Sequence, residues 1–330
     1  MADANVLPAS SPDSIRLAGA IIRLGGLVAF PTETVYGLGC DAMNPDAVAK
    51  VFDVKQRPRF DPLIVHLDDR SMLSTIVKSI PPAAQRLMEV FWPGPLTLIL
   101  PKQPNVPDLV TAGLPTVAVR MPDHPVAQAL IRESRTPIAA PSANPFGYVS
   151  PTTAQHVHAG LGDRLDLILD GGPCSIGVES TILSFAGPLP EIVRPGSLSL
   201  ENIQAIIGPV VHAPSADKEG QAPGQSARHY ATSTPVTILP AQGAWPAHQD
   251  HERVGLLAMS TPRHSTGRFR AVEVLAPSGD LREAAHRLFA ALRRLDELCL
   301  DHLYIEPCQE EGLGLAIMDR LRRCAAPARP

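Results

Sequence analysis

The segment LVAFPTETVYGLG, residues 27–39, joins an apolar run to a polar turn. Leu27 to Phe30 are consecutive apolar residues, which is typical of a buried strand. Residues 31–34 then bring threonine hydroxyls and a carboxylate, and residues 36–39 bring a pair of glycines. Open α/β sheets bind ligands in the crevice beyond the ends of their strands. The segment therefore predicts a strand that carries hydroxyls and exposed backbone to the edge of a binding crevice.

The residues before this strand predict a helix. Its apolar face would consist of Ile15, Ala18, Ile21 and Ile22, and the glycines at 25 and 26 would end it. The apolar stretch 17–30 is broken by Arg23 and is too short to cross a bilayer. Because no basic cluster precedes it, no targeting segment is indicated, and we expect a cytoplasmic protein with no membrane partner.

Downstream, apolar runs alternate with helical patterns. Strands are expected at 63–67, 96–100, 116–120, 137–140, 166–169 and 179–185. Helices are expected at 45–54, 82–91, 124–134, 152–159 and 200–207. This alternation predicts a mixed, twisted α/β sheet, although periodicity alone does not give its strand order.

The composition changes between about Pro214 and Pro235 to an aperiodic mixture that is typical of a linker. Beyond it, short strands are expected at 236–239, 253–260, 271–276 and 302–307, with helices at 281–299 and 315–324. The predicted organisation is a larger α/β domain over 1–212, a linker over 213–235 and a smaller α/β domain over 236–330. The sequence assigns no chemistry to this last domain.

Length and composition agree with this organisation. The chain has 330 residues, enough for about two domains that each bury a core. Its apolar content of 45% and charged content of 19% are those of an ordinary globular protein. A net charge of −4 excludes a global polyanion-binding surface, so any RNA contact would be local. The five cysteines include no Cys-x-x-Cys pair, which excludes a zinc-finger or disulfide framework and fits a reducing compartment.

A pair of cations follows the helix expected at 45–54, which Asn44 would cap. Lys55 and Arg57 lie two residues apart at the start of KQRPRFDPLIVH, residues 55–66, and an extended backbone would point both the same way. A lysine point charge and an arginine fork are the usual pair for a polyphosphate. Alone, however, a Lys-x-Arg beside proline is more often a solvated turn.

Other candidates also have an ordinary structural alternative. Ser142 and Asn144 precede Pro145, where both residue types commonly bond their own backbone in a turn. His66 ends an apolar run and would equally fit a structural role, as a histidine at the end of a strand whose ring nitrogens are hydrogen-bonded to the protein. The order and spacing of the motifs, rather than any one of them, favours a nucleotide site.

That order resembles the threonylcarbamoyl-AMP synthase family, in its long form with a second domain after the YrdC-like catalytic domain. The motifs that carry the resemblance are FPTETVYGLG, K-x-R-P…PLIVH, FWPGPLT at 91–97, TVAVRMP at 116–122, Ser-Ala-Asn within 141–152, GVESTI at 177–182, VRPG at 193–196 and APGQSARHYA at 222–231. The resemblance implies a twisted mixed-sheet YrdC-like domain and a smaller C-terminal α/β domain of Rossmann-like type.

The resemblance also implies a reaction. L-threonine, bicarbonate and ATP would give threonylcarbamoyl-AMP and pyrophosphate, and a downstream tRNA threonylcarbamoyl transferase complex would use the product to modify the adenosine next to the anticodon. Such chemistry depends on positioning and charge neutralisation rather than on a nucleophilic triad. Mg²⁺ is expected to enter with ATP, held by phosphates and water, and no structural metal is expected.

Residue roles follow from the matching positions. Lys55 and Arg57 would be the catalytic cations. The L-threonine pocket would comprise Thr34, His66, Arg120, Ala140 and Ser180. The ATP side would comprise Arg57, Asp61, Thr116, Ser142, Asn144, Ser150, Arg194 and Tyr230, with Tyr230 on a lid formed by the linker. Thr116 would otherwise merely start a strand, and Ser150 would merely cap the following helix.

The chain departs from the family pattern at three places. Asp61 stands where many relatives have asparagine, and a carboxylate beside a triphosphate is repulsive unless it meets the adenine amine or a metal. Phe146 replaces a common serine, and residues 225–227 replace a more basic lid sequence.

Two other functions are alternatives to this one. A non-catalytic RNA-binding or ribosome-binding protein would use the same domain, and salt-dependent RNA binding without ATP would favour it. A carbamoyltransferase-type relative would carry zinc-finger modules, which the cysteine spacing excludes.

Overall fold

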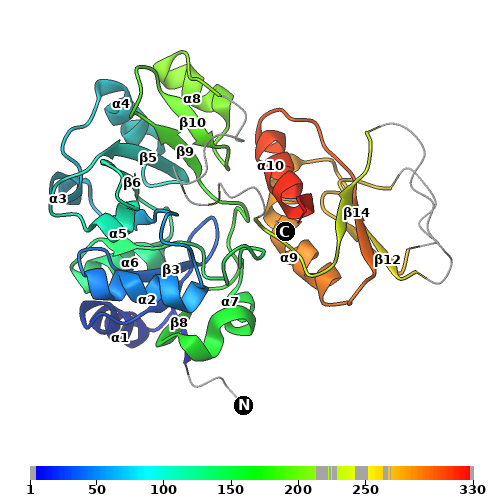
Figure 1. Ribbon diagram of the computed structural model, residues 1–330, viewed down its shortest axis with the longest axis horizontal. Coiled ribbons are helices and arrows are strands. Elements are labelled where there is room, and N and C mark those ends of the chain that lie inside the picture. The colour runs from blue at the N-terminus through cyan, green and yellow to red at the C-terminus, as the bar shows by residue number, and fades with distance from the viewer. Residues whose placement is uncertain are drawn as a thin grey trace.

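The computed structural model describes residues 5–212, 222, 224, 229–241, 252–262, 267 and 269–327. It contains two sheets, a ten-stranded sheet in the first part of the chain and a four-stranded sheet in the last. Figure 1 shows the larger α/β unit beside the smaller one, with the termini on different units. The predicted mixed α/β fold is therefore confirmed.

The large sheet is built from strands β1 to β10. They are β1 (Val6–Pro8), β2 (Val28–Phe30), β3 (Gly37–Asp41), β4 (Ile64–His66), β5 (Leu96–Pro101), β6 (Thr116–Arg120), β7 (Ile138–Ala139), β8 (Leu167–Asp170), β9 (Thr181–Ser184) and β10 (Glu191–Arg194). Their order in the sheet is β1-β8-β2-β3-β7-β4-β6-β5-β9-β10. The sheet is mixed, because it contains parallel pairs such as β4 with β6 and antiparallel pairs such as β5 with β6.

Helices cover both faces of this sheet. They are α1 (Pro12–Arg23), α2 (Pro45–Lys55), α3 (Leu73–Ile76), α4 (Pro82–Phe91), α5 (Asp108–Thr111), α6 (Pro125–Ser134), α7 (Ala154–Leu161) and α8 (Leu200–Ile207), with 3-10 turns at Arg70–Met72 and Gly162–Arg164. Asn44 caps α2 as expected, since its side chain accepts from the N–H groups of Asp46 and Ala47.

The two faces of the sheet have different cores. Alternate residues of each strand point to opposite faces, so Ala29 and Val65 join a core with α2 and α4, whereas Phe30 joins one with α1 and α6. On the face of Phe30, a separate small cluster contains Ile64, Ile99, Ala118, Ile182, Val193 and Ala222. This cluster is a patch of sheet that the paired helices α1 and α6 leave open, and residue 222 of the linker lies on it.

Within the described residues, the second unit is a small parallel sheet with two helices. Its strands are β11 (Val236–Ile238), β12 (Val254–Ala258), β13 (Ala271–Val274) and β14 (His302–Ile305), ordered β11-β14-β12-β13 with every neighbouring pair parallel. Its helices are α9 (Leu281–Asp296) and α10 (Leu313–Ala325), which pack against each other. The edge strands β11 and β13 are only half-buried, because each has a neighbouring strand on one side only.

Strands β1, β3 and β10 were not predicted from the sequence, and each omission has a physical explanation. β3 contains two glycines, which are depleted in strands, yet it pairs along its length with β2 and β7. β1 is three residues long, and β10 pairs irregularly with β9 after Ile192. The domain boundaries at 212 and 235 stay a prediction, since residues 213–221 and 225–228, which include part of the expected lid, lie outside the described residues. Within the described ranges, no helix has the length and apolarity needed to cross a membrane.

Candidate active site

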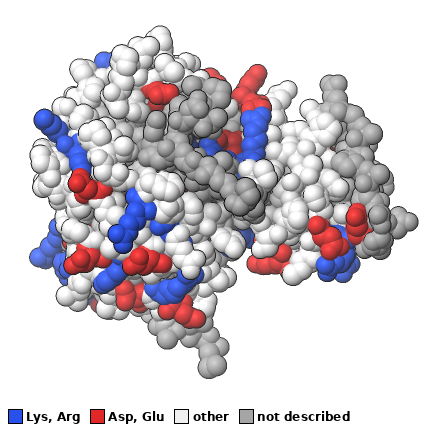
Figure 2. Space-filling model, viewed as in Figure 1, with Lys and Arg blue, Asp and Glu red and all other residues white. Residues whose placement is uncertain are grey.

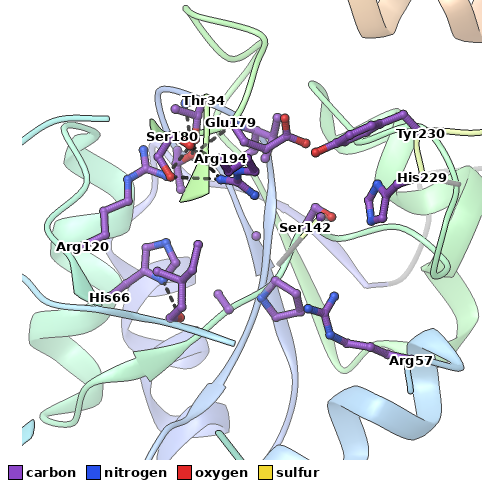
Figure 3. Close-up of a pocket in the computed structure, with 17 residues that line it drawn as sticks. Thr34, Arg57, His66, Arg120, Ser142, Glu179, Ser180, Arg194, His229 and Tyr230 are labelled. Carbon is purple, nitrogen blue, oxygen red and sulfur yellow. Dashed lines mark hydrogen bonds between the residues drawn. The ribbon is translucent and has the colours of Figure 1, made fainter. Parts of the chain in front are cut away.

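A pocket with about 520 Å³ of empty volume, partly open to solvent, lies over the open patch of the large sheet. It is lined by Thr32, Thr34, Val35, Gly37, Arg57, Ile64, His66, Arg120, Ala140, Pro141, Ser142, Glu179, Ser180, Arg194, Gly224, His229 and Tyr230. Figure 3 shows Arg120 and His66 on one side, Arg57, His229 and Tyr230 on the other, and Ser142 between them. The pocket brings together nine of the fourteen residues predicted for the site.

Arg120 anchors one side of the pocket at the end of β6. Its Nη1 donates to Thr34 Oγ1 at 2.9 Å, and its Nη2 lies 2.6 Å from Glu33 Oε1. Both ionic side chains are buried, because the side chain of Arg120 is 4% exposed and that of Glu33 is 6% exposed. Each terminal nitrogen keeps a second N–H, so the guanidinium is oriented by the protein and still has donors for a ligand.

His66 ends β4 beside Arg120, and it is neutral. Burial, reinforced by Arg120, lowers the pKa of His66 to about 3. Its Nδ1 lies 3.1 Å from the carbonyl oxygen of Ile64 and donates to it in the tautomer that satisfies both groups. The other ring nitrogen is then a hydrogen-bond acceptor within the pocket wall.

Arg194 and Ser180 form the wall from β9 and β10. Nη2 of Arg194 donates to the backbone oxygen of Ser180 at 2.9 Å and to its Oγ at 3.2 Å. Ser180 Oγ also lies 2.8 Å from Thr97 Oγ1. The hydroxyl and the guanidinium are thereby fixed in one network, as the dashed lines of Figure 3 show in part.

Arg57 reaches the opposite side of the pocket from the loop after α2. It forms a buried ion pair with Asp61, with Nη2 2.9 Å from Oδ1, and it donates to the carbonyl oxygens of Asp61 and Pro62 at 3.1 and 2.9 Å. Among the described residues, its Nη1 has no hydrogen-bond partner. Asp61 does not line the pocket, and its carboxylate forms an ion pair with Arg57.

The side chain of Lys55 does not point the same way as that of Arg57, contrary to the expectation from the sequence. It is the last residue of α2, and Gln56 adopts a left-handed conformation with φ 54°, so residues 55–57 are not extended. Its Nζ donates to the carbonyl oxygens of Ser142, at 2.5 Å, and Asn144. Burial and the charge of Arg57 lower the pKa of Lys55 well below its ordinary value, although Asp61 acts in the opposite direction. Lys55 therefore supports the Ser142 loop from behind and is not among the lining residues.

Three other predicted residues also lie outside the lining. Asn144 donates from Nδ2 to the carbonyl oxygens of Pro145 and Tyr148, at 2.8 and 2.9 Å, and so shapes its own turn. Thr116 is half-buried at the far end of β6, on the same face as Arg120 but about 13 Å along the strand. Ser150 does not cap α7, whose cap is Thr153, but donates to Glu179 Oε1 at 2.6 Å.

Tyr230 lines the pocket from the segment that joins the two units. It is fully buried with φ 59°, a conformation that is costly for a residue other than glycine and clusters at functional sites. Its hydroxyl has no hydrogen-bond partner among the described residues. Gly224 also approaches closely, since a β-carbon there would lie 2.9 Å from that hydroxyl. His229 is kept neutral, because burial, followed by the charges of Arg57 and Lys55, lowers its pKa well below the ordinary value.

Sequence reasoning missed four residues of this site. Glu33, Glu179 and His229 lie inside the quoted motifs, next to Thr34, Ser180 and Tyr230, so their position was the available signal. Arg320 of α10 contacts the lining residue Glu179, with Nε 3.1 Å from Oε2. It had no signal in the sequence, because a single arginine in an amphipathic helix is normally solvated. No group of three His, Cys, Asp or Glu side chains in the described ranges could hold a metal ion.

The arrangement can bind two anions side by side. Three buried arginines, Arg57, Arg120 and Arg194, reach one pocket from separate segments, and each is oriented by a protein oxygen while keeping its charge. Bidentate cations of this kind hold carboxylates and phosphates. A neutral histidine and several hydroxyls lie between them, so the pocket suits an amino acid next to a phosphorylated ligand.

Two family models together match almost the whole chain. The model described as "Telomere recombination" matches residues 20–196, and the model described as "Threonylcarbamoyl-AMP synthase, C-terminal domain" matches residues 198–326.

Individual relatives extend over the full chain as well. The threonylcarbamoyl-AMP synthase of Bacillus subtilis strain 168 is 46% identical over 323 residues, covering 94% of this chain and 92% of that protein. The threonylcarbamoyl-AMP synthase of Pyrococcus abyssi strain GE5 is 43% identical over 319 residues, covering 94% of each. The crystal structure of P. abyssi Sua5 complexed with L-threonine aligns with a TM-score of 0.87 at 40% identity, covering 96% of this chain and 95% of that one.

Proposed function

This chain belongs to the threonylcarbamoyl-AMP synthase family, and we propose that its pocket condenses L-threonine, CO₂ or bicarbonate, and ATP into threonylcarbamoyl-AMP and pyrophosphate. The observation that carries the proposal is the convergence of the buried side chains of Arg57, Arg120 and Arg194 on one pocket. Among relatives that align over almost the whole chain, one has been solved with L-threonine.

The amino acid is proposed to lie against Arg120. The remaining N–H groups on Nη1 and Nη2 would hold the threonine carboxylate, while Thr34 and Glu33 keep the fork in place. His66, Ala140 and Ser180 would form the rest of this subsite, because all three line the pocket and His66 is paired with Arg120 between strands β4 and β6.

His66 would favour the neutral amine of threonine. A neutral imidazole that donates from Nδ1 to Ile64 offers only a lone pair on its other nitrogen. That lone pair accepts an N–H from a neutral amine, and the nearby charge of Arg120 disfavours an ammonium. Only the neutral amine can attack CO₂, so the subsite would present threonine in its reactive form.

ATP is proposed to occupy the side of Arg57, Ser142, Arg194 and Tyr230. The free Nη1 of Arg57 and the charge of Arg194 would neutralise the phosphates as charge develops on the leaving pyrophosphate. Tyr230 and His229 would exclude water from the adenylate, which water would otherwise hydrolyse.

The remaining predicted residues are proposed to act through others. Lys55 and Asn144 would fix the loop that presents Ser142, and Asp61 would orient Arg57. Ser150 would act through Glu179, and Thr116 would lie at the outer end of the ATP side. Lys55 is therefore proposed as a positioning residue rather than a catalytic one.

The reaction needs two bond-forming steps. The threonine amine adds to CO₂ and loses a proton to give a carbamate, and a carbamate oxygen then attacks the α-phosphorus while pyrophosphate leaves. Such transfers are accelerated by positioning and charge neutralisation. Mg²⁺ is proposed to accompany ATP through phosphate and water ligands. The product would pass to a tRNA threonylcarbamoyl transferase complex.

The RNA-binding alternative is not favoured. The full-length relatives are synthases. On the face shown in Figure 2, basic and acidic side chains are interspersed among the described residues, without the broad basic patch that RNA binding would use.

The direct test is pyrophosphate release from ATP and bicarbonate by the purified protein, with and without L-threonine and with serine in parallel. We expect release that depends on threonine. Folded protein that releases none, yet binds RNA in a salt-dependent manner, would instead support the RNA-binding alternative.

Two substitutions separate the subsites in the same assay. Arg120→Ala should lower kcat/KM for threonine about 100-fold, and Arg57→Ala should lower kcat/KM for ATP by a similar factor, since each loses a charge-assisted contact worth about 2–3 kcal/mol. Normal turnover by both folded variants would refute this site assignment.

A further inference from the structure

Arg320 is an arginine of the second unit that is buried beside the pocket of the first. It lies on α10 and is 0% exposed, the largest side chain with that degree of burial. Its Nε lies 3.1 Å from Glu179 Oε2, and its Nη1 donates to the carbonyl oxygen of Pro195 at 2.5 Å and to Asp319 Oδ2 at 2.9 Å. Two of these three partners belong to the first unit.

Both of those partners adjoin the pocket. Glu179 lines it and accepts a hydrogen bond from Ser150 through its other oxygen, at 2.6 Å. Pro195 directly follows Arg194, which also lines the pocket. The guanidinium of Arg320 therefore contacts both Glu179, which lines the pocket, and Pro195, which is adjacent to a lining residue.

Arg320 also faces the lid residue. Its Cζ lies 5.4 Å from the centre of the Tyr230 ring, within the range of a cation–π contact. The same ring stacks on Phe289 of α9, with centroids 5.3 Å apart and planes inclined by 20°. Two side chains of the second unit thus hold the ring that closes the pocket.

The burial of Arg320 needs an explanation beyond adhesion between the units. Burying an ion pair is costly, and apolar residues of similar volume often stabilise a protein as well or better. Other contacts already join the units away from this point. His286 Nδ1 lies 3.1 Å from the Ser175 carbonyl oxygen, and Arg293 donates to the Val149 carbonyl oxygen.

We propose that Arg320 is a positioning residue for the ATP side of the pocket, because it holds the Glu179–Ser150 wall and the Tyr230 ring in their working positions. The second unit thereby completes the site without touching threonine. This inference rests on the proposed function, since it names the part of that site on which Arg320 acts.

The primary test is a comparison of Arg320→Met with a matched control on the same helix. Arg322→Met removes an arginine whose side chain is 54% exposed and paired with Glu310 within the second unit. In Arg320→Met we expect KM for ATP to rise about tenfold or more, equivalent to at least about 1.4 kcal/mol, while KM for threonine changes less than about twofold. Arg322→Met should match the wild type in both constants.

A loss of stability must be separated from a loss of positioning. Adhesion alone predicts a lower unfolding temperature with unchanged KM values, and that result would overturn the inference. Arg320→Lys retains one charged donor toward Glu179, so it should restore part of the ATP affinity. If Arg320→Met does not fold, Arg320→Lys carries the same comparison, with a smaller rise in KM for ATP expected.

A double-mutant cycle tests the route through Glu179. If Arg320 acts through that carboxylate, Glu179→Gln combined with Arg320→Met should raise KM for ATP little beyond the larger single effect. Independent, multiplying effects would contradict the route. Threonine-dependent turnover by the wild type is the reference for the proposed function. If that is absent, calorimetric ATP binding by wild type, Arg320→Met and Arg322→Met still decides the role of Arg320.

Discussion

At the scale of single residues, the site depends on cations that the protein orients before any ligand arrives. Arg120 is held by Thr34 and Glu33, and Arg57 is held by Asp61 and Pro62. Each guanidinium donates some of its N–H groups to protein oxygens and has others that remain available in the pocket. This arrangement reduces the reorganisation needed when a carboxylate or phosphate binds.

His66 supplies a prediction about pH. Because burial and Arg120 lower its pKa to about 3, His66 should stay neutral throughout the working range. We expect kcat/KM for threonine to rise with pH as the substrate amine loses its proton, with no ionisation near pH 6.5 from this residue. NMR titration of His66, assigned by comparison with His66→Gln, checks the cause. A titration midpoint near 6.5 would contradict it.

Asp61 supplies a prediction about charge. Its carboxylate neutralises Arg57 within a buried pair, so Asp61→Asn should leave the guanidinium more attractive to phosphate. The backbone oxygens of Asp61 and Pro62 still orient it. We expect KM for ATP to stay level or fall about two- to fivefold, on the order of 0.4–1 kcal/mol. A several-fold rise in KM for ATP, measured at constant threonine, would show that the carboxylate itself contributes to nucleotide binding.

At the scale of elements, the large strands and helices followed from periodicity, whereas the pocket did not. Helices such as α4 and α8 match their predicted ranges because their apolar faces repeat at helical spacing. β3 was missed because it contains two glycines, which are depleted in strands, although pairing with its neighbours stabilises it. The orientation of Lys55 was also wrong, because the left-handed Gln56 that ends α2 leaves no mark in the sequence.

The partners of charged side chains were equally hard to predict. That Arg320 meets Glu179 depends on a contact between residues 141 positions apart, which no local pattern records. Glu33 and Glu179 stood inside the motifs, yet single-sequence reasoning gave them no role. The motif residues could be identified from the sequence, but their division between the pocket lining and its support required the fold.

The loop after β8 supplies a prediction about how elements fit. Gly177 has φ 87°, and a β-carbon there would lie 2.5 Å from the carbonyl oxygen of His286 in α9. Gly172 has a similar φ of 80° but no heavy atom near such a β-carbon. Alanine at either position should cost about 1–3 kcal/mol of backbone strain. Only Gly177→Ala should also separate α9 from the first unit.

The comparison of the two alanine variants is made by thermal unfolding and ATP kinetics. Gly177→Ala should unfold at a lower temperature than Gly172→Ala and should also bind ATP more weakly, because α9 carries Phe289 beneath Tyr230. Equal behaviour of the two variants would mean that the contact between Gly177 and α9 contributes little.

At the scale of the whole molecule, the second unit contributes to the site through buried charge. Glu179 lies between Arg320 of that unit, Arg194 of the pocket and the hydroxyl of Ser150. Burial works to raise the pKa of Glu179, but these partners outweigh it and hold the pKa below its ordinary value. The contact between the units is therefore linked to pH.

The sign of that linkage gives a stability prediction. A carboxylate with a lowered folded-state pKa stabilises the protein fully above its unfolded value of about 4.3, and the stabilisation is lost as pH falls through the folded value. We expect the unfolding temperature to fall below about pH 4.5, and Glu179→Gln to be less stable at pH 7 but to lose less on acidification. Parallel curves for the two proteins would contradict this role of Glu179.

The central claim is that the pocket forms a threonylcarbamoyl adenylate, and its most direct test is mass spectrometry of the product made with ¹³C-labelled bicarbonate. The account predicts a nucleotide product that contains threonine, AMP and one labelled carbon. It should form in proportion to pyrophosphate and be absent without threonine. Pyrophosphate release with AMP alone, and no labelled adduct under conditions that protect it from hydrolysis, would contradict the account.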